Sequence, residues 1–391
     1  MHASSWLNLA ALGLGLGDVT GACTHAQRAL RLDRGNADAW VNFAAASWHA
    51  GQRRDGARAM QQALDLAPGL DVAALNLSLM FRAVQQPERA YTVLASALAH
   101  APDSVRLHRA MAELCRLLQR HDQVRAHALA ALSAWMPKLA PTQGADQGPE
   151  PEDALAQAKL LATMADACDR LEGAGIGFHL VGGVVLGIVR QGQPFAGDKD
   201  VDFGVDFDAD RDQVAALFAQ GYTRIQVPDS VAAKRWCLGF VHDATGVGVD
   251  LFFKQRIPGK LRICLGWPDD LYFDLPEYQV APFRWQERDW PMPAPLEEYL
   301  AADYGADWRE PQREVAGHVF DKRWYDSQIS SPSLAPESLR CAQNLVLLRV
   351  LAAIQQGRWP KVLALCDQLH AAQPLAEVEA LRARLLAAGI R

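Results

Sequence analysis

Several features that mark large protein classes are missing from this sequence. Its seven cysteines are scattered, with no CxxC pair and no Cys/His cluster, so neither a zinc knuckle nor a disulfide framework is indicated. A reducing, cytoplasmic compartment is the simplest interpretation. No apolar run reaches the roughly 20 residues that a membrane span needs. Lysine and arginine number 39 against 45 acidic residues, and this net charge of −6 argues against binding nucleic acid mainly by charge.

Common catalytic motifs are also absent. The chain has no P-loop, no HExxH and no GxSxG. The apolar stretch from Trp6 to Gly17 lacks the preceding Lys or Arg of a signal peptide. What is present is a chain of 391 residues that is 50% apolar, which is enough for two or three domains with their own cores.

The first third of the chain repeats itself every 34 residues. An Ala-Leu pair recurs at Ala29, Ala63, Ala97 and Ala131, and Trp6/Trp40, Gly17/Gly51 and Pro68/Pro102 share the same spacing. A small residue near each turn would let two helices approach closely, and the Pro would end each pair. The period and the order of these residues resemble tetratricopeptide repeats, which implies an all-α superhelix over residues 1–138. Such repeats offer a surface for a protein partner, and no residue pattern identifies that partner.

Two joints divide the rest of the chain. Residues 139–153 are rich in Pro, Gly and acidic residues without apolar periodicity, as in a linker. A second joint lies near Ser331, and the apolar spacing after it predicts a short helical, repeat-like tail over 331–391. The segment 154–330 between the joints differs in pattern and is expected to be an α+β domain that carries the chemistry.

The acidic residues of this middle segment follow a strand pattern. Asp200 and Asp202 alternate with buried-type residues, so both carboxylates should project from one face of a strand. Asp250 lies within a second strand candidate, residues 246–253, and could join them. Three converging carboxylates repel one another unless a hard divalent cation such as Mg²⁺ or Mn²⁺ compensates. The later acidic residues from Asp206 to Asp212 are expected to be a solvated surface run.

A possible anion site precedes these strands. Gly182 and Gly183 stand between a short apolar run and a short predicted helix, where backbone N–H groups suit a phosphate. Arg190 would lie about two turns along that helix, where its guanidinium could reach the phosphate. His179 reads as a core residue, and Lys254 is a candidate contact for phosphate or acceptor.

The ordered combination resembles the LicD/fukutin family within the nucleotidyltransferase superfamily. The family's G-x-L-L-G-x-x-R stretch is echoed by residues 183–190, its P-W-D-x-D-x-D stretch by 194–202, and its D-I/L-F strand by 250–252. Residues 291–311 are similar to the family segment that runs from a Pro through E-x-Y-L to Y-G-x-x-W-x-x-P. The likeness covers about residues 157–325. Gly197 stands where the family usually has Trp, and Lys199 where it often has another acid.

This resemblance implies a fold with a mixed sheet and an activity. The activity is transfer of a phospho-alcohol, such as phosphocholine, phosphoribitol or phosphoglycerol, from a CDP-linked donor to a glycan hydroxyl, with release of CMP. Asp200 and Asp202 would bind Mg²⁺ or Mn²⁺, with Asp250 as third ligand or base. Asp198 would bind a second ion or orient the first. The diphosphate would lie against Gly182, Gly183 and Arg190.

Other functions fit the same residues. A nucleotidyltransferase that moves an NMP from an NTP would use the same three aspartates. A glycosyltransferase with a DxD motif fits less well, because only about 45 residues separate the linker from Asp200. The non-enzymatic alternative is a repeat scaffold that carries an inactive domain.

Overall fold

The chain divides into two compact units, Met1–Ala140 and Pro141–Arg391. The computed structural model describes residues 2–141, 154–195, 198–225, 236–265, 271–310, 313–315, 318–320, 329 and 331–390. The boundary between the units falls within the predicted linker 139–153, of which residues 142–153 lie outside the described residues.

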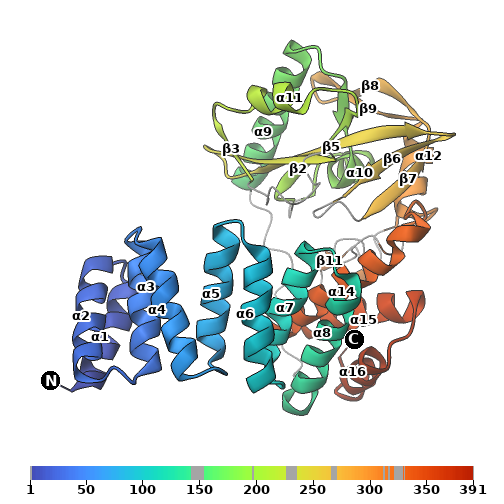
Figure 1. Cartoon of the computed structure of the whole chain (residues 1–391). Coiled ribbons are helices and arrows are strands. Elements are labelled where there is room, and N and C mark those ends of the chain that lie inside the picture. Colours follow the sequence, from blue (N-terminus) through green and yellow to red (C-terminus); the bar gives the residue numbers. More distant parts are fainter. Residues whose placement is uncertain are drawn as a thin grey trace. The chain divides into compact units, whose positions relative to one another are not determined.

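The first unit consists of four helical hairpins followed by a short 3-10 turn, Met136–Lys138 (Figure 1). Its helices are α1 (Ala3–Gly15), α2 (Val19–Leu32), α3 (Ala37–His49), α4 (Arg53–Leu66), α5 (Asp71–Ala83), α6 (Pro87–His100), α7 (Val105–Leu117) and α8 (His121–Trp135). The first helix of each hairpin begins 34 residues after the previous one, and so does the second. This confirms the predicted repeat, and the unit fits a stack of tetratricopeptide repeats.

Small residues let the helices of a hairpin approach closely. All four recurrent Ala-Leu pairs are buried, as are the small residues near the turns. At Gly56 a Cβ atom would lie only 2.9 Å from the carbonyl oxygen of Ala44, on the partner helix. A side chain at this position would therefore push α3 and α4 apart.

The turn inside each hairpin uses a left-handed residue. Gly17 and Gly51 have φ of 77° and 81°, and the equivalent residues of the next two repeats, Gln85 and Gln119, have φ of 60° and 54°. Glycine enters this region without steric cost, whereas a residue with a Cβ does so less readily. The last two repeats thus keep the turn although they have lost the glycine that identifies it in the sequence.

The second unit holds a mixed sheet with helices around it (Figure 1). Its helices before the tail are α9 (Ala154–Gly173), α10 (Gly182–Gln191), α11 (Arg211–Leu217) and α12 (Leu296–Tyr304). The strands of the sheet are β1 (Phe178–Leu180), β2 (Asp200–Asp206), β3 (Tyr222–Arg224), β4 (Cys237–His242), β5 (Gly248–Ile257), β6 (Lys260–Cys264) and β7 (Tyr272–Pro276). Two further pairs are β8 (Gln279–Trp285) with β9 (Arg288–Ala294), and β10 (Arg313–Val315) with β11 (His318–Phe320).

The strand order β1-β2-β5-β4-β3 places β2 and β5 side by side at the middle of the sheet. They run parallel, whereas β1 lies antiparallel to β2 and β4 lies antiparallel to β5. Val201, Phe203 and Val205 of β2 are fully buried in the core, and α9 contacts both β2 and β5. Because side chains alternate along a strand, the aspartates of β2 project from the opposite face.

The predicted helical tail is present as α14 (Leu339–Gln355), α15 (Trp359–Ala372) and α16 (Ala376–Ala387). Gly357, with φ of 68°, forms the turn between α14 and α15. The tail is tied to the sheet before α14 begins, because Ser338 Oγ accepts a hydrogen bond of 2.8 Å from the N–H of Tyr272. None of the helices in the described part of the chain combines the length and the apolar character needed to cross a bilayer.

Candidate metal centre

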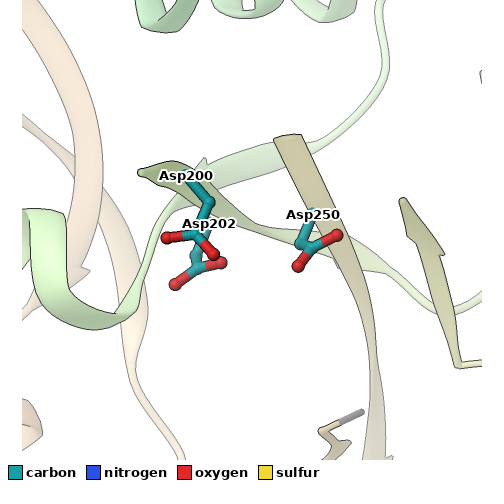
Figure 2. A group of neighbouring side chains, drawn as sticks. All are labelled: Asp200, Asp202 and Asp250. Atoms are coloured by element: carbon teal, nitrogen blue, oxygen red, sulfur yellow. The ribbon is translucent and has the colours of Figure 1, made fainter. Parts of the chain in front are cut away.

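Three aspartates meet where β2 and β5 run side by side. The register pairs Asp202 directly with Asp250, and Asp200 lies two residues before Asp202 on the same face. One carboxylate oxygen from each of the three lies within 4.8 Å of the others. Figure 2 shows the carboxylates on the same side of the two strands. Oxygens this close can share one divalent ion, since ligands on opposite sides of Mg²⁺ are about 4 Å apart.

Glycines surround the cluster, and each leaves room for one carboxylate. A Cβ at Gly182 would lie 2.7 Å from Asp202 Oδ2, and one at Gly239 would lie 2.9 Å from Asp250 Oδ1. A Cβ at Gly248 would lie 3.1 Å from the Cβ of Asp200. Each aspartate of the cluster thus has one glycine next to it, and the backbone at that glycine lies close to the aspartate side chain.

The acidic groups of this region hold their protons more tightly than usual. Burial raises the pKa of Asp202 well above its ordinary value, and the charges of Asp200, Asp250 and Asp198 raise it further. Burial and the charge of Asp200 raise the pKa of Asp250 to about 6 and that of Asp198 to about 7. Burial also raises the pKa of Asp200. A cation would relieve this repulsion, so the donor set suits a hard divalent ion.

The predicted anion site differs from expectation in one respect. Gly182 and Gly183 are the first residues of α10 and do not precede it. The N–H of Gly182 donates a 3.3 Å hydrogen bond to the hydroxyl of Tyr299, so this N–H already has a partner. The N-cap residue, Val181, has no side chain that could accept a hydrogen bond, and it therefore leaves the next N–H groups of the first turn uncapped.

Asp198 lies beside the cluster, whereas Arg190 contacts Phe195 and Trp308. Asp198 Oδ2 accepts a 3.3 Å hydrogen bond from the N–H of Phe195, and a Cβ at Gly183 would lie 3.7 Å from Asp198 Oδ1. The guanidinium of Arg190 lies 4.7 Å from the ring centre of Phe195 and is 3.5 Å from the carbonyl oxygen of Trp308. Phe195 thus contacts both side chains near the N-terminal end of β2.

Lys254 lies in a buried polar network further along the same face. It is four residues beyond Asp250 on β5, which is about 13 Å at the usual rise of a strand. Its Nζ lies 3.4 Å from Asp206 and 3.1 Å from Nδ1 of His179, whose Nε2 is 2.8 Å from the hydroxyl of Tyr278. These contacts are those of a structural ion pair, and a role for Lys254 in substrate binding stays a prediction. His179 is a fully buried core residue, as predicted.

Other polar and aromatic residues of the middle segment either have structural roles or lie outside the described residues. Asp210, from the acidic run, caps α11 by accepting hydrogen bonds from the N–H groups of Asp212 and Gln213. Trp285 and Trp290 are buried in the core. Lys234, Arg235 and Trp267, whose side-chain types could contact a phosphate or a nucleotide base, lie outside the described residues.

Two residues of α12 influence the surroundings of the cluster without having been predicted to do so. Tyr299 accepts the hydrogen bond from the N–H of Gly182, and the charge of Asp303 contributes to the raised pKa of Asp202. They lie four residues apart and therefore share one face of the helix. This four-residue spacing is the signal that the sequence contains. It is hard to recognise, because Glu297 and Glu298 precede it and are typical of a solvent-exposed helix.

Comparisons with known proteins add little to this geometry. No protein-family model matches the chain, and no curated protein matches it. Among solved structures, MamA is 17% identical, over 35% of this chain and 80% of its own, with a TM-score of 0.31. A thermophilic TPR protein of Thermus thermophilus is 21% identical, over 44% of this chain and 92% of its own, with a TM-score of 0.30. A mutant O-GlcNAc transferase of Thermobaculum terrenum is 23% identical, over 39% and 29%, also with a TM-score of 0.30. Likenesses this low carry no inference about activity, and the repeat architecture is read from the chain's own helices.

Proposed function

We propose that the second unit is a metal-dependent phosphoryl-transfer domain. One observation carries this proposal: Asp200, Asp202 and Asp250 converge at one point, and a glycine adjoins each of them. Asp200 is exposed and Asp202 and Asp250 are partly buried, and three carboxylates this close repel one another unless a cation lies between them. A site that binds a divalent ion next to an anionic substrate accounts for both the three carboxylates and the glycines beside them.

The resemblance to the LicD/fukutin family suggests the substrates, a CDP-linked alcohol and a glycan hydroxyl. The acceptor oxygen would form a new bond to the phosphorus that carries the alcohol. The bond from that phosphorus to the oxygen shared with the CMP phosphate would break, and CMP would leave with the electron pair. The hydroxyl proton would pass to a base at the site.

The residues divide these tasks by position. Asp200, Asp202 and Asp250 would hold the ion, and a bound divalent ion would neutralise charge on the phosphate oxygens. The N–H groups at the start of α10 have no side-chain cap and would favour an anionic phosphate there. Asp250 would serve as the third metal ligand or as the base that accepts the hydroxyl proton. Its pKa is raised to about 6, which is closer to neutral pH than that of an ordinary aspartate and suits a base. Asp198 would orient the ion or bind a second one.

The repeat unit would serve a different purpose, the binding of a protein partner. Its large exposed apolar side chains support this role, and they are Leu12, Leu16, Leu32, Leu66 and Leu79. A chain that binds partners through the repeats but neither binds metal nor turns over nucleotides would be the scaffold of the non-enzymatic alternative.

The decisive experiment supplies candidate donors to wild type and to Asp200→Asn. CDP-choline, CDP-ribitol, CDP-glycerol and NTPs are tested with Mg²⁺, with and without a chelator. We expect CMP from one CDP-alcohol, loss of turnover in Asp200→Asn, and no change in Asp208→Asn, which alters an aspartate of the acidic run beyond β2. Pyrophosphate from an NTP would favour the nucleotidyltransferase. Full activity of Asp200→Asn would refute the metal assignment.

A further inference from the structure

A fourth acidic side chain, Asp303 of α12, is largely buried and has no protein partner among the described residues. The residue is 9% exposed. Within the described part of the chain, no hydrogen bond or ion pair reaches its carboxyl group. Burial alone raises its pKa to about 7. A largely buried carboxylate without a protein donor depends on water or on a cation for its stabilisation.

The surroundings of α12 show which way Asp303 faces. Tyr299, one turn earlier on the same face, accepts a hydrogen bond from the N–H of Gly182 at 3.3 Å. Gly182 in turn adjoins Asp202, whose Oδ2 would be 2.7 Å from a Cβ at that glycine. The charge of Asp303 is felt at Asp202, where it adds to the rise in pKa. This face of α12 therefore borders the cluster on the Asp202 side.

Such an arrangement is unfavourable in the absence of a cation. A helix that served only to cover Tyr278 and Gly182 would be as well packed with a neutral residue at position 303. Instead, α12 carries a fourth titratable carboxyl group, whose charge acts on Asp202 when it is ionised. Divalent ions bind six or more oxygen atoms, and carboxylates just outside the directly bound set raise metal affinity through bound water or by orienting ligands.

We propose that Asp303 is the fourth acidic group of the metal centre and that its carboxylate contributes to binding the divalent cation. This inference rests on the proposed metal site. The missing partner of the buried carboxylate is then the ion, or a water molecule bound to it. Asp303 joins the centre from α12, on the side of Asp202.

Replacing Asp303 by asparagine separates this role from a structural one. The substitution keeps the shape of the side chain and removes only the charge. If Asp303 serves the metal, the metal-free variant should be at least as stable as wild type, because a buried repulsion is gone. Its affinity for Mn²⁺ should fall by about 10- to 100-fold, the range seen when residues that contact the metal ligands, and not the metal itself, are replaced. A purely structural residue would give the reverse: lower stability and unchanged affinity.

The experiment uses the full chain, with Mn²⁺ as the probe. Mn²⁺ affinity is measured by calorimetry, and thermal unfolding is followed with and without Mn²⁺. Asp289→Asn is the matched control, since it removes a surface charge that pairs with Arg284 at 3.4 Å. Asp303→Glu should recover part of the affinity that the asparagine variant loses.

Each outcome decides the question. Weaker Mn²⁺ binding in a stable Asp303→Asn protein supports the proposal. Wild-type affinity in that variant, or its failure to fold, overturns the proposal and leaves the three-aspartate site intact. Absence of Mn²⁺ binding in wild type overturns both this inference and the proposed function.

Discussion

Replacing Gly182 by alanine tests most sharply how the carboxylate cluster is held. Gly182 has φ of +67°, and a Cβ there would lie 2.7 Å from Asp202 Oδ2. The left-handed backbone costs a residue with a Cβ roughly 1–2 kcal/mol. The overlap can be relieved only if the Asp202 carboxylate moves. We therefore expect a less stable second unit and Mn²⁺ affinity reduced by about tenfold or more, which corresponds to about 1.4 kcal/mol.

The neighbouring glycine provides the control. At Gly183 the nearest atom to an added Cβ is Asp198 Oδ1 at 3.7 Å, an ordinary contact, and φ is not positive. Alanine in a helix is favoured over glycine by roughly 0.5–1 kcal/mol, so Gly183→Ala should stabilise the unit and leave Mn²⁺ binding unchanged. In thermal unfolding, the transition whose midpoint rises when Mn²⁺ is added is assigned to the second unit, because the proposed metal site lies there. If the two alanine variants behaved alike, the reasoning about Asp202 would be wrong.

Two further predictions concern protonation and the buried network. The folded-state pKa values of Asp250 and Asp198, about 6 and about 7, lie above the usual carboxyl value, so the metal-free protein should lose stability as pH rises from about 4 to 7. Mg²⁺ affinity should increase over the same range, because the ion displaces those protons; pH-dependent calorimetry checks this, and a flat profile would contradict it. Lys254→Met should destabilise the second unit by about 1–3 kcal/mol by leaving His179 Nδ1 without its partner, with an unchanged donor KM. A raised KM with unchanged stability would instead make Lys254 a substrate contact.

The repeats could be predicted because their information is local and recurs. Every helix start follows the 34-residue period, and the buried Ala-Leu pairs mark the inner face of each second helix. The sequence did not reveal that Gln85 and Gln119 adopt the same turn as Gly17 and Gly51. In those repeats, the packing of the two helices imposes a conformation that the residue itself does not favour.

The candidate metal centre was only partly predictable for a different reason. Alternation along one strand places Asp200 and Asp202 on the same face, and this depends on two neighbouring positions in the sequence. Asp303 is about a hundred residues further on, and only the packing of α12 brings it to Asp202. The start of α10 at Gly182 was also hidden, because the need for glycine comes from Asp202, a residue that is distant in sequence.

The parallel pairing of β2 with β5 has a consequence for how this protein becomes functional. The two strands are joined through β3 and β4, so their alignment is settled only after a long intervening stretch of chain has found its place. A slip of one residue would turn Asp250 toward the apolar side and carry Leu251 into its position. If the three aspartates bind a divalent ion as proposed, metal binding would report correct strand alignment, because a misaligned sheet could retain most of its secondary structure and still hold no ion.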